Sequence, residues 1–126
     1  MTCELVKVSD ALTTIEVMGQ DLGELQPAPF DMVFLDADKT RLLEYVEAFL
    51  SSNRILKNCG IVVVDNVLWK GLVLEADSEE AELRENRRAR KLASKMHRFN
   101  SEIVLDDRVE VLVLPMRDGF SVPRKK

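Results

Sequence analysis

Two short polar clusters, each directly after an apolar run, carry the residue types best suited to chemistry. The first is D-A-D-K at 36–39 and the second is D-N at 65–66. Asp36, Asp65 and the Asn66 amide offer only oxygen donors, which suit a hard cation such as Mg²⁺, Mn²⁺ or Ca²⁺ better than zinc. Two neighbouring carboxylates repel each other, and a shared cation removes that repulsion. The alternative is that each acid only caps the helix or turn after its own strand.

Lys39 is the second candidate for chemistry, because the sequence predicts it in the first turn of a helix. A cation in that position opposes the helix macrodipole, at a cost of about 0.3–1 kcal/mol. The same field, joined by a bound divalent ion, would favour the neutral form of the lysine and make it a better proton acceptor. The plainer alternative is a solvent-facing lysine that pairs with Asp36 or Asp38.

Two buried parallel strands are the elements that must position these residues. Residues 32–35 form an uninterrupted apolar run and residues 61–64 a β-branched one, as expected for strands buried on both faces of a parallel sheet. Neighbouring strands lie about 4.8 Å apart. Asp36 and Asp65 should therefore emerge side by side at the carboxyl edge of the sheet, where open α/β sheets bind ligands.

Helical periodicity and turn residues connect the two strands. Apolar residues at helical spacing predict a helix over about 39–53, with Asp38 as its cap. Residues 57–60, K-N-C-G, predict a turn before the second strand. The resulting βαβ unit indicates an α/β, Rossmann-like fold with a mostly parallel sheet.

The rest of the chain supplies further strands and one long helix. Residues 1–5 and 13–18 predict strands, the first of them weak. Asp77 and Glu80 form a plausible capping box for a helix with an apolar stripe. The stripe of this helix consists of Ala89, Leu92, Ala93, Met96, Phe99 and Ile103. Residues 109–114 and 120–122 predict an antiparallel pair of strands at the carboxyl terminus.

Composition places the chain among soluble globular proteins. It has 126 residues, 46% of them hydrophobic, and a net charge of −4, which argues against general nucleic-acid binding. Cys3 and Cys59 are too few for a disulfide framework, so a reducing compartment is expected. No apolar run approaches the roughly 20 residues that span a bilayer, and no signal peptide is evident. We expect a cytoplasmic protein without a nucleic-acid or membrane partner.

Three separated motifs together resemble a known family. D-A-D-K at 36–39, V-V-V-D-N-V-L-W-K-G at 62–71 and R-V-E-V-L-V-L-P-M-R-D-G-F at 108–120 are similar to the carboxyl-terminal half of the cation-dependent O-methyltransferases. This family includes the caffeoyl-CoA and catechol O-methyltransferases. The resemblance extends from Phe30 to the end of the chain, and the motifs occur in the family's order and spacing.

The resemblance implies methyl transfer from S-adenosylmethionine to a hydroxyl of a catechol-like or hydroxycinnamoyl-type acceptor. Asp36, Asp65 and Asn66 would hold the divalent cation, with Mg²⁺ the first choice and Mn²⁺ or Ca²⁺ the alternatives. Lys39 would be the catalytic base that removes the proton of the acceptor hydroxyl.

The same resemblance assigns Glu4, Asp36 and Asp38 to S-adenosylmethionine. Trp69 would cover the acceptor, although it could equally fill the loop after the second strand. The family's first strand and glycine-rich loop should precede Glu4, so we expect residues 1–126 to form a single, partial methyltransferase domain. An open sheet edge would then be free to pair with another chain, and a homo-oligomer is possible.

Two other functions compete with this interpretation. The chain could be a non-catalytic remnant or interaction module that keeps the half-fold, and such a module would not bind S-adenosylmethionine saturably. A phospho-acceptor receiver domain also has about this length and strand-end aspartates around Mg²⁺. It is disfavoured because an acidic pair after the first strand and a lysine after a late strand are not found.

Overall fold

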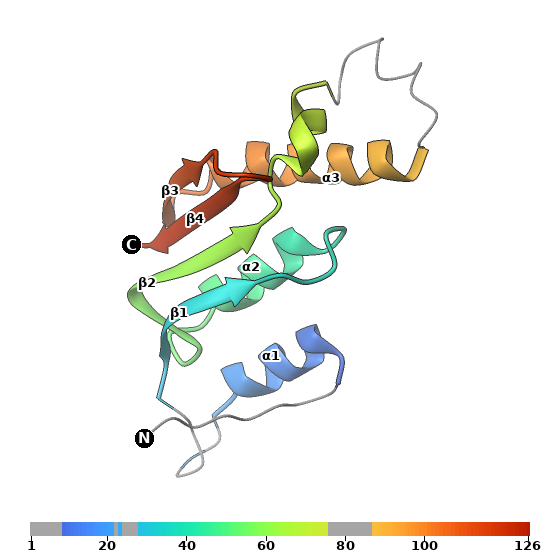
Figure 1. Ribbon diagram of the computed structural model, residues 1–126. Helices are drawn as coiled ribbons and strands as arrows, with labels where there is room; N and C mark the ends of the chain where they lie inside the picture. Colours follow the sequence, from blue (N-terminus) through green and yellow to red (C-terminus); the bar gives the residue numbers. More distant parts are fainter. Residues whose placement is uncertain (1–8, 22, 24–27, 76–86) are drawn as a thin grey trace.

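A four-stranded mixed sheet organises the computed structural model, which describes residues 9–21, 23, 28–75 and 87–126. The strands are β1 (Phe30–Leu35), β2 (Leu56–Asp65), β3 (Val109–Leu114) and β4 (Phe120–Lys125), in the spatial order β1-β2-β4-β3 (Figure 1). β1 and β2 are parallel, whereas β4 runs antiparallel to both β2 and β3. This confirms the predicted α/β fold with an antiparallel pair of carboxyl-terminal strands.

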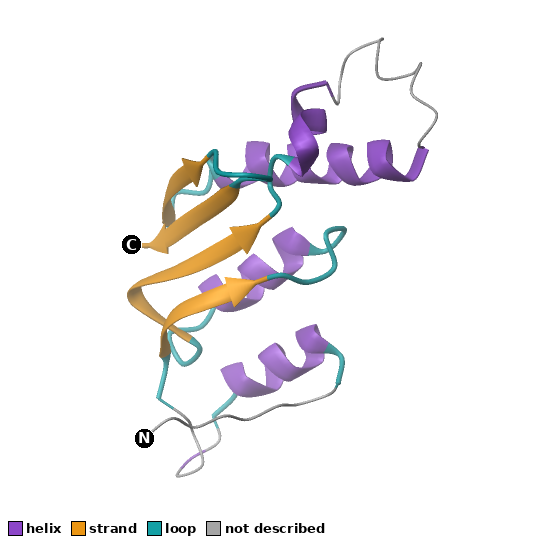
Figure 2. Ribbon diagram, in the orientation of Figure 1, coloured by secondary structure: helices purple, strands orange, loops and turns teal. Residues whose placement is uncertain are grey.

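In the described part of the chain, three α-helices and the 3₁₀ segment η2 accompany the sheet (Figure 2). They are α1 (Ala11–Gly19), α2 (Leu42–Leu50), η2 (Trp69–Glu75) and α3 (Arg87–Ile103). None of the helices in the described part of the chain is long and apolar enough to cross a membrane.

The predicted strand over residues 13–18 is wrong, because this stretch lies within α1. Asp10 caps the helix by accepting a hydrogen bond from the Thr13 backbone N–H at 2.9 Å. Leu12 and Ile15, three positions apart, are both buried in the core, as the same face of a helix requires. The cap and the buried face thus outweigh the β preference of the local sequence.

The turn before α2 also differs from the prediction, because the helix begins at Leu42 rather than near Lys39. The Asp38 carboxylate accepts hydrogen bonds from the Thr40 N–H and hydroxyl, both at 2.9 Å. It therefore caps a turn that precedes the helix. Arg41 occupies the N-cap of α2 without a side-chain cap bond. Lys39 lies before the helix, so it does not oppose the macrodipole from the first turn, contrary to the prediction.

A bulge replaces the turn that was predicted over residues 57–60. These residues belong to β2, which already begins at Leu56. Cys59, an exposed free thiol, adopts a positive φ of 63°, and the pairing with β1 shifts register between Phe30 and Met32. The positive φ of Cys59 therefore belongs to an irregularity inside the strand rather than to a turn before it.

The long apolar stripe is confirmed in α3, where Ala93, Met96, Phe99 and Ile103 are buried. The capping pair proposed for this helix, Asp77 and Glu80, lies outside the described residues, as does the strand predicted over residues 1–5. The stripe packs into the same core as α1, α2 and the inner side chains of β2.

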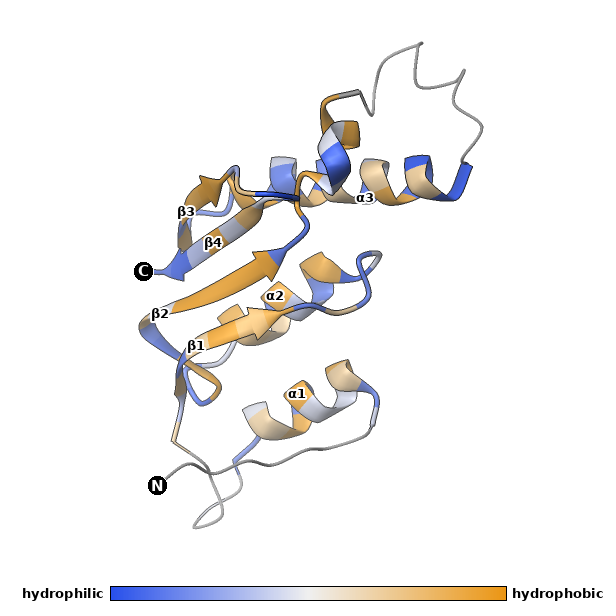
Figure 3. Cartoon of the chain, viewed as in Figure 1, coloured by the Kyte–Doolittle hydropathy of each residue, from blue (hydrophilic) through white to orange (hydrophobic). Residues whose placement is uncertain are grey.

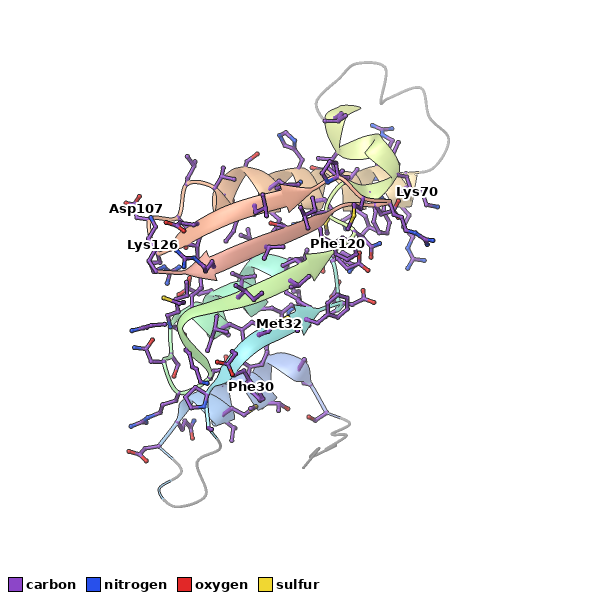
Figure 4. All side chains as sticks on the ribbon, turned by 60° about the vertical axis from the view of Figure 1, so that its left-hand side comes forward. Phe30, Met32, Lys70, Asp107, Phe120 and Lys126 are labelled. Carbon is purple, nitrogen blue, oxygen red and sulfur yellow. The ribbon has the colours of Figure 1, made fainter. Side chains whose placement is uncertain are left out.

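The core lies on one side of the sheet. Val62 and Val64 of β2 are fully buried, whereas Met32 and Phe34 of β1 are 59% and 58% exposed. Figure 4 shows the helices behind the sheet and marks Phe30 and Met32 along β1. β1 therefore has one covered and one open face among the described residues, so the prediction of burial on both faces is wrong for this strand.

An arginine joins α2 to the corner where β3 begins. Arg108 donates to both carboxylate oxygens of Glu47, at 3.0 and 2.6 Å, and to Asp106 at 2.7 Å. At the same corner, marked by Asp107 and Lys126 in Figure 4, Lys126 Nζ donates to the Asp107 carbonyl at 2.8 Å. The hydrogen bonds from Arg108 lower the pKa of Glu47 and of Asp106.

Replacing Arg108 with alanine should lower the free energy of unfolding at neutral pH by no more than about 1 kcal/mol, because these groups are partly exposed. A carboxylate whose pKa is lowered by folding stabilises the fold above its unfolded pKa and loses that contribution as pH falls through its folded pKa. The difference between wild type and Arg108→Ala should therefore shrink in acid, as measured by urea unfolding at several pH values. A difference that stays constant down to strongly acidic pH would contradict the ion-pair account.

Candidate functional site

The ends of β1 and β2 lie next to each other at the carboxyl edge of the parallel pair. Leu35 is paired with Val64, so Asp36 and Asp65 follow at adjacent strand ends. Figure 3 shows the hydrophobic colours of both strands giving way to hydrophilic ones at this edge. The prediction that these strands are immediate neighbours is confirmed.

Lys39 joins the two strand ends. Its Nζ donates to Asp36 Oδ1 at 2.8 Å and to the backbone carbonyl of Asp65 at 3.2 Å. The lysine side chain is only 12% exposed, whereas that of Asp36 is 57% exposed. Lys39 pairs with Asp36, as the plainer interpretation expected, but it is largely buried rather than solvent-facing. The ammonium group of Lys39 therefore lies between the ends of β1 and β2.

A tight backbone turn holds Asp65 and Asn66 directly after β2. Asp65 Oδ1 accepts a hydrogen bond from the Asn66 N–H at 2.7 Å, and Asn66 has a left-handed φ of 64°, which asparagine tolerates better than most residues. Both side chains are half-buried. They line a cavity of about 490 Å³ together with Arg117, Asp118 and Phe120.

The loop after Asn66 is held from two sides by residues that the sequence did not single out. The Val67 N–H donates to the Gly119 carbonyl at 3.2 Å, and the Leu68 N–H donates to the Asp118 carbonyl at 2.7 Å. From α3, Asn100 Nδ2 donates to the Val67 carbonyl at 2.8 Å. Local sequence patterns indicate neither the contact of residues 118–119 with this loop nor the contact of Asn100 with it.

The free oxygens at the strand ends fit a hard divalent cation. Among the described residues, no hydrogen bond occupies Asp36 Oδ2, Asp65 Oδ2 or the Asn66 side-chain oxygen. Within that same part of the chain, no three His, Cys, Asp or Glu side chains are grouped to hold a metal, so the donor set is limited to two carboxylates and one amide. Mg²⁺ commonly takes one or two carboxylates and keeps several waters, which agrees with so small a set.

The remaining predicted site residues do not join this group. Asp38 is exposed, and the hydrogen bonds that it accepts from Thr40 lower its pKa. Glu4 lies outside the described residues. Trp69 lines a different cavity, of about 330 Å³, between η2 and the first turns of α3. The other residues around that cavity are Lys70, Leu72, Arg88, Ala89 and Leu92.

The fold is that of the class I methyltransferases. The SAH-bound methyltransferase PaMTH1 of Podospora anserina matches 94% of this chain with a TM-score of 0.73 and 25% sequence identity. A putative caffeoyl-CoA O-methyltransferase from Staphylococcus aureus matches the same share with a TM-score of 0.73 at 24% identity, which supports the fold alone. This chain covers 47% and 49% of those two chains.

The chain belongs to the O-methyltransferase family, whose model matches residues 4–126. It is 34% identical over 118 residues to a putative caffeoyl-CoA O-methyltransferase of Arabidopsis thaliana, covering 93% of this chain and 45% of the relative. It is 39% identical over 104 residues to tricin synthase 2 of Oryza sativa subsp. japonica, covering 82% of this chain and 33% of the relative. The chain thus spans less than half the length of these relatives.

Proposed function

We propose that this chain provides the metal-binding and acceptor-binding part of an O-methyltransferase. The enzyme would transfer the methyl group of S-adenosylmethionine to one hydroxyl of a catechol-like acceptor. The observation that carries the proposal is the position of Lys39, whose Nζ lies 2.8 Å from Asp36 and bridges to the end of β2. Family membership supports the reaction type, and the all-oxygen donor set supports the help of a divalent cation.

The chemistry follows from the residues at the strand ends. A divalent cation, most simply Mg²⁺, would be held by Asp36, Asp65 and Asn66 and would supply positive charge that favours ionisation of adjacent hydroxyls. Lys39 Nζ would accept the proton of the acceptor hydroxyl. The acceptor oxygen would then form a bond to the methyl carbon of S-adenosylmethionine while the bond from that carbon to sulfur breaks.

The acceptor class, the residues that contact S-adenosylmethionine and the location of the protein are part of the same proposal. Names of the relatives, such as caffeoyl-CoA O-methyltransferase, support a hydroxycinnamoyl-type acceptor, and a cavity of about 490 Å³ at Asp65 is in the usual range for small ligands. Glu4 and Asp38 would contact S-adenosylmethionine, and Trp69 the acceptor. A cytoplasmic location and self-association through the open edge of β1 complete the proposal.

The ionisation of a coloured catechol at the site, followed by its absorption spectrum, tests the proposal. In the presence of Mg²⁺ and wild-type protein, the catecholate absorption band of 4-nitrocatechol should appear at lower pH than without protein, because the site favours the ionised acceptor. Asp65→Asn and Lys39→Met should each reduce that shift. Asp107 is an exposed acid at the opposite end of the sheet (Figure 4). Asp107→Asn is therefore the matched control and should show the same shift as wild type. Equal shifts in Asp65→Asn and wild type would overturn the proposal.

A further inference from the structure

Asn100 is a half-buried polar residue beside the apolar stripe of α3. The nearby stripe residues Phe99 and Ile103 are 1% and 3% exposed. Its Nδ2 donates to the Val67 carbonyl, while its Oδ1 is buried without a hydrogen-bond partner among the described residues. Burying an amide oxygen unpaired costs free energy that an apolar residue would avoid. The side chain is therefore costly for the core, and its one hydrogen bond is directed to the loop after β2.

That hydrogen bond completes the support of the loop. The N–H groups of Val67 and Leu68 are already bonded to carbonyls of the turn between β3 and β4. Asn100 supplies the partner of the Val67 carbonyl, one residue after Asn66. Asn66 has a left-handed φ of 64°, a conformation that costs some free energy even for asparagine, so contacts that fix the next peptide group help to hold it.

We propose that Asn100 is a positioning residue for Asn66. By holding the Val67 peptide group, Asn100 keeps Asn66 in its left-handed conformation, so that the Asn66 amide oxygen and the Asp65 carboxylate are presented together to the divalent cation. This inference rests on the proposed function, because it takes Asp36, Asp65 and Asn66 as the cation ligands. Loss of such an outer partner of a metal ligand typically weakens metal affinity about 10–100-fold.

The test compares Mn²⁺ dissociation constants, measured by isothermal titration and by the electron paramagnetic resonance of free Mn²⁺, so it does not depend on turnover. Asn100→Leu keeps the size of the side chain and removes its donor, and the dissociation constant should rise at least about tenfold. Asn100→Asp, a near-isosteric change that also removes the amide donor, is the second variant and should weaken binding as well.

Two controls separate positioning from general loss of stability. Ile103→Val loosens the same face of α3 one turn further on, and Ser121→Ala removes another buried polar atom without a partner in the described residues. Both should keep the wild-type affinity.

In wild-type protein, the NMR signals of the Asn100 side-chain NH₂ should shift during titration with Mg²⁺, in parallel with the Asn66 amide. This readout needs no variant to fold.

The outcomes are distinct. Wild-type affinity in folded Asn100→Leu, an equal loss in Ile103→Val, or Asn100 signals that do not respond to Mg²⁺ would each overturn the inference alone. A wild-type chain without any Mn²⁺ site that depends on Asp65 would overturn the proposed function, and the inference with it.

Discussion

Replacing Gly119 with alanine should lower the free energy of unfolding by about 2–5 kcal/mol, because two costs combine at this turn. Gly119 has a φ of 80°, and a Cβ atom there would clash with Leu68 Cγ. The left-handed conformation costs an L-residue about 1–2 kcal/mol, and overpacking a tight contact costs about 1–3 kcal/mol. Urea unfolding of the two proteins measures the difference.

Gly71 provides the matched control for this substitution. Its φ is 78°, nearly that of Gly119, but no atom lies within 4 Å of the position that a Cβ would take. Gly71→Ala should therefore show only the conformational cost of about 1–2 kcal/mol. If the two variants lost the same stability, the contact between the turn and Leu68 would not be a tight one. The loop that follows Asn66 would then lack part of its support.

The isolated chain of 126 residues should self-associate through β1 and the open face of the sheet. Among the described residues, β1 pairs only with β2, so its outer edge presents unpaired backbone groups. Phe30, Met32 and Phe34 alternate along β1 with 43%, 59% and 58% of their surface exposed, which places them on one face. Exposed apolar edge strands of this kind recruit further strands.

Sedimentation velocity over a range of protein concentrations measures this association. Phe34→Lys should shift the protein to monomer, because pairing two copies of β1 would bring like charges together at a cost of several kcal/mol, and each 1.4 kcal/mol is about tenfold in the dissociation constant. Leu105→Lys is the control, since Leu105 is 80% exposed but lies beyond α3. A monomer at all concentrations, or an equal effect of both substitutions, would contradict this prediction.

The strands and the neighbouring acids could be predicted from the sequence because local patterns determine them. The apolar runs before Asp36 and Asp65 mark strand ends, and a parallel βαβ unit places successive strand ends at one edge. By contrast, residues 13–18 favour a strand locally, and only the Asp10 cap and the burial of Ile15 in the core make them helical. Packing between elements overrides a short β-branched stretch.

The contacts that complete the site depend on tertiary structure and leave no local signal. Asn100 bonds to Val67, a residue 33 positions away, and a lone asparagine in an amphipathic helix does not indicate such a partner. The alternative interpretation paired Lys39 with Asp36 or Asp38, and Lys39 does pair with Asp36. Its second contact, with the Asp65 carbonyl, follows only from the pairing of β1 with β2. The open face of β1 was not predicted, because an apolar run indicates a strand but does not indicate which of its faces other elements cover.

Titration of Mn²⁺ into wild-type protein and into Asp65→Ala tests the central claim, which is that the acids at the two strand ends share a divalent cation. Wild type should bind one Mn²⁺ ion, and the heat of binding should be lost in Asp65→Ala, because that variant removes one of only two carboxylates in the donor set. Asp107→Ala should bind as wild type does. Equal affinity in Asp65→Ala and wild type would show that each acid only caps the helix or turn that follows its strand.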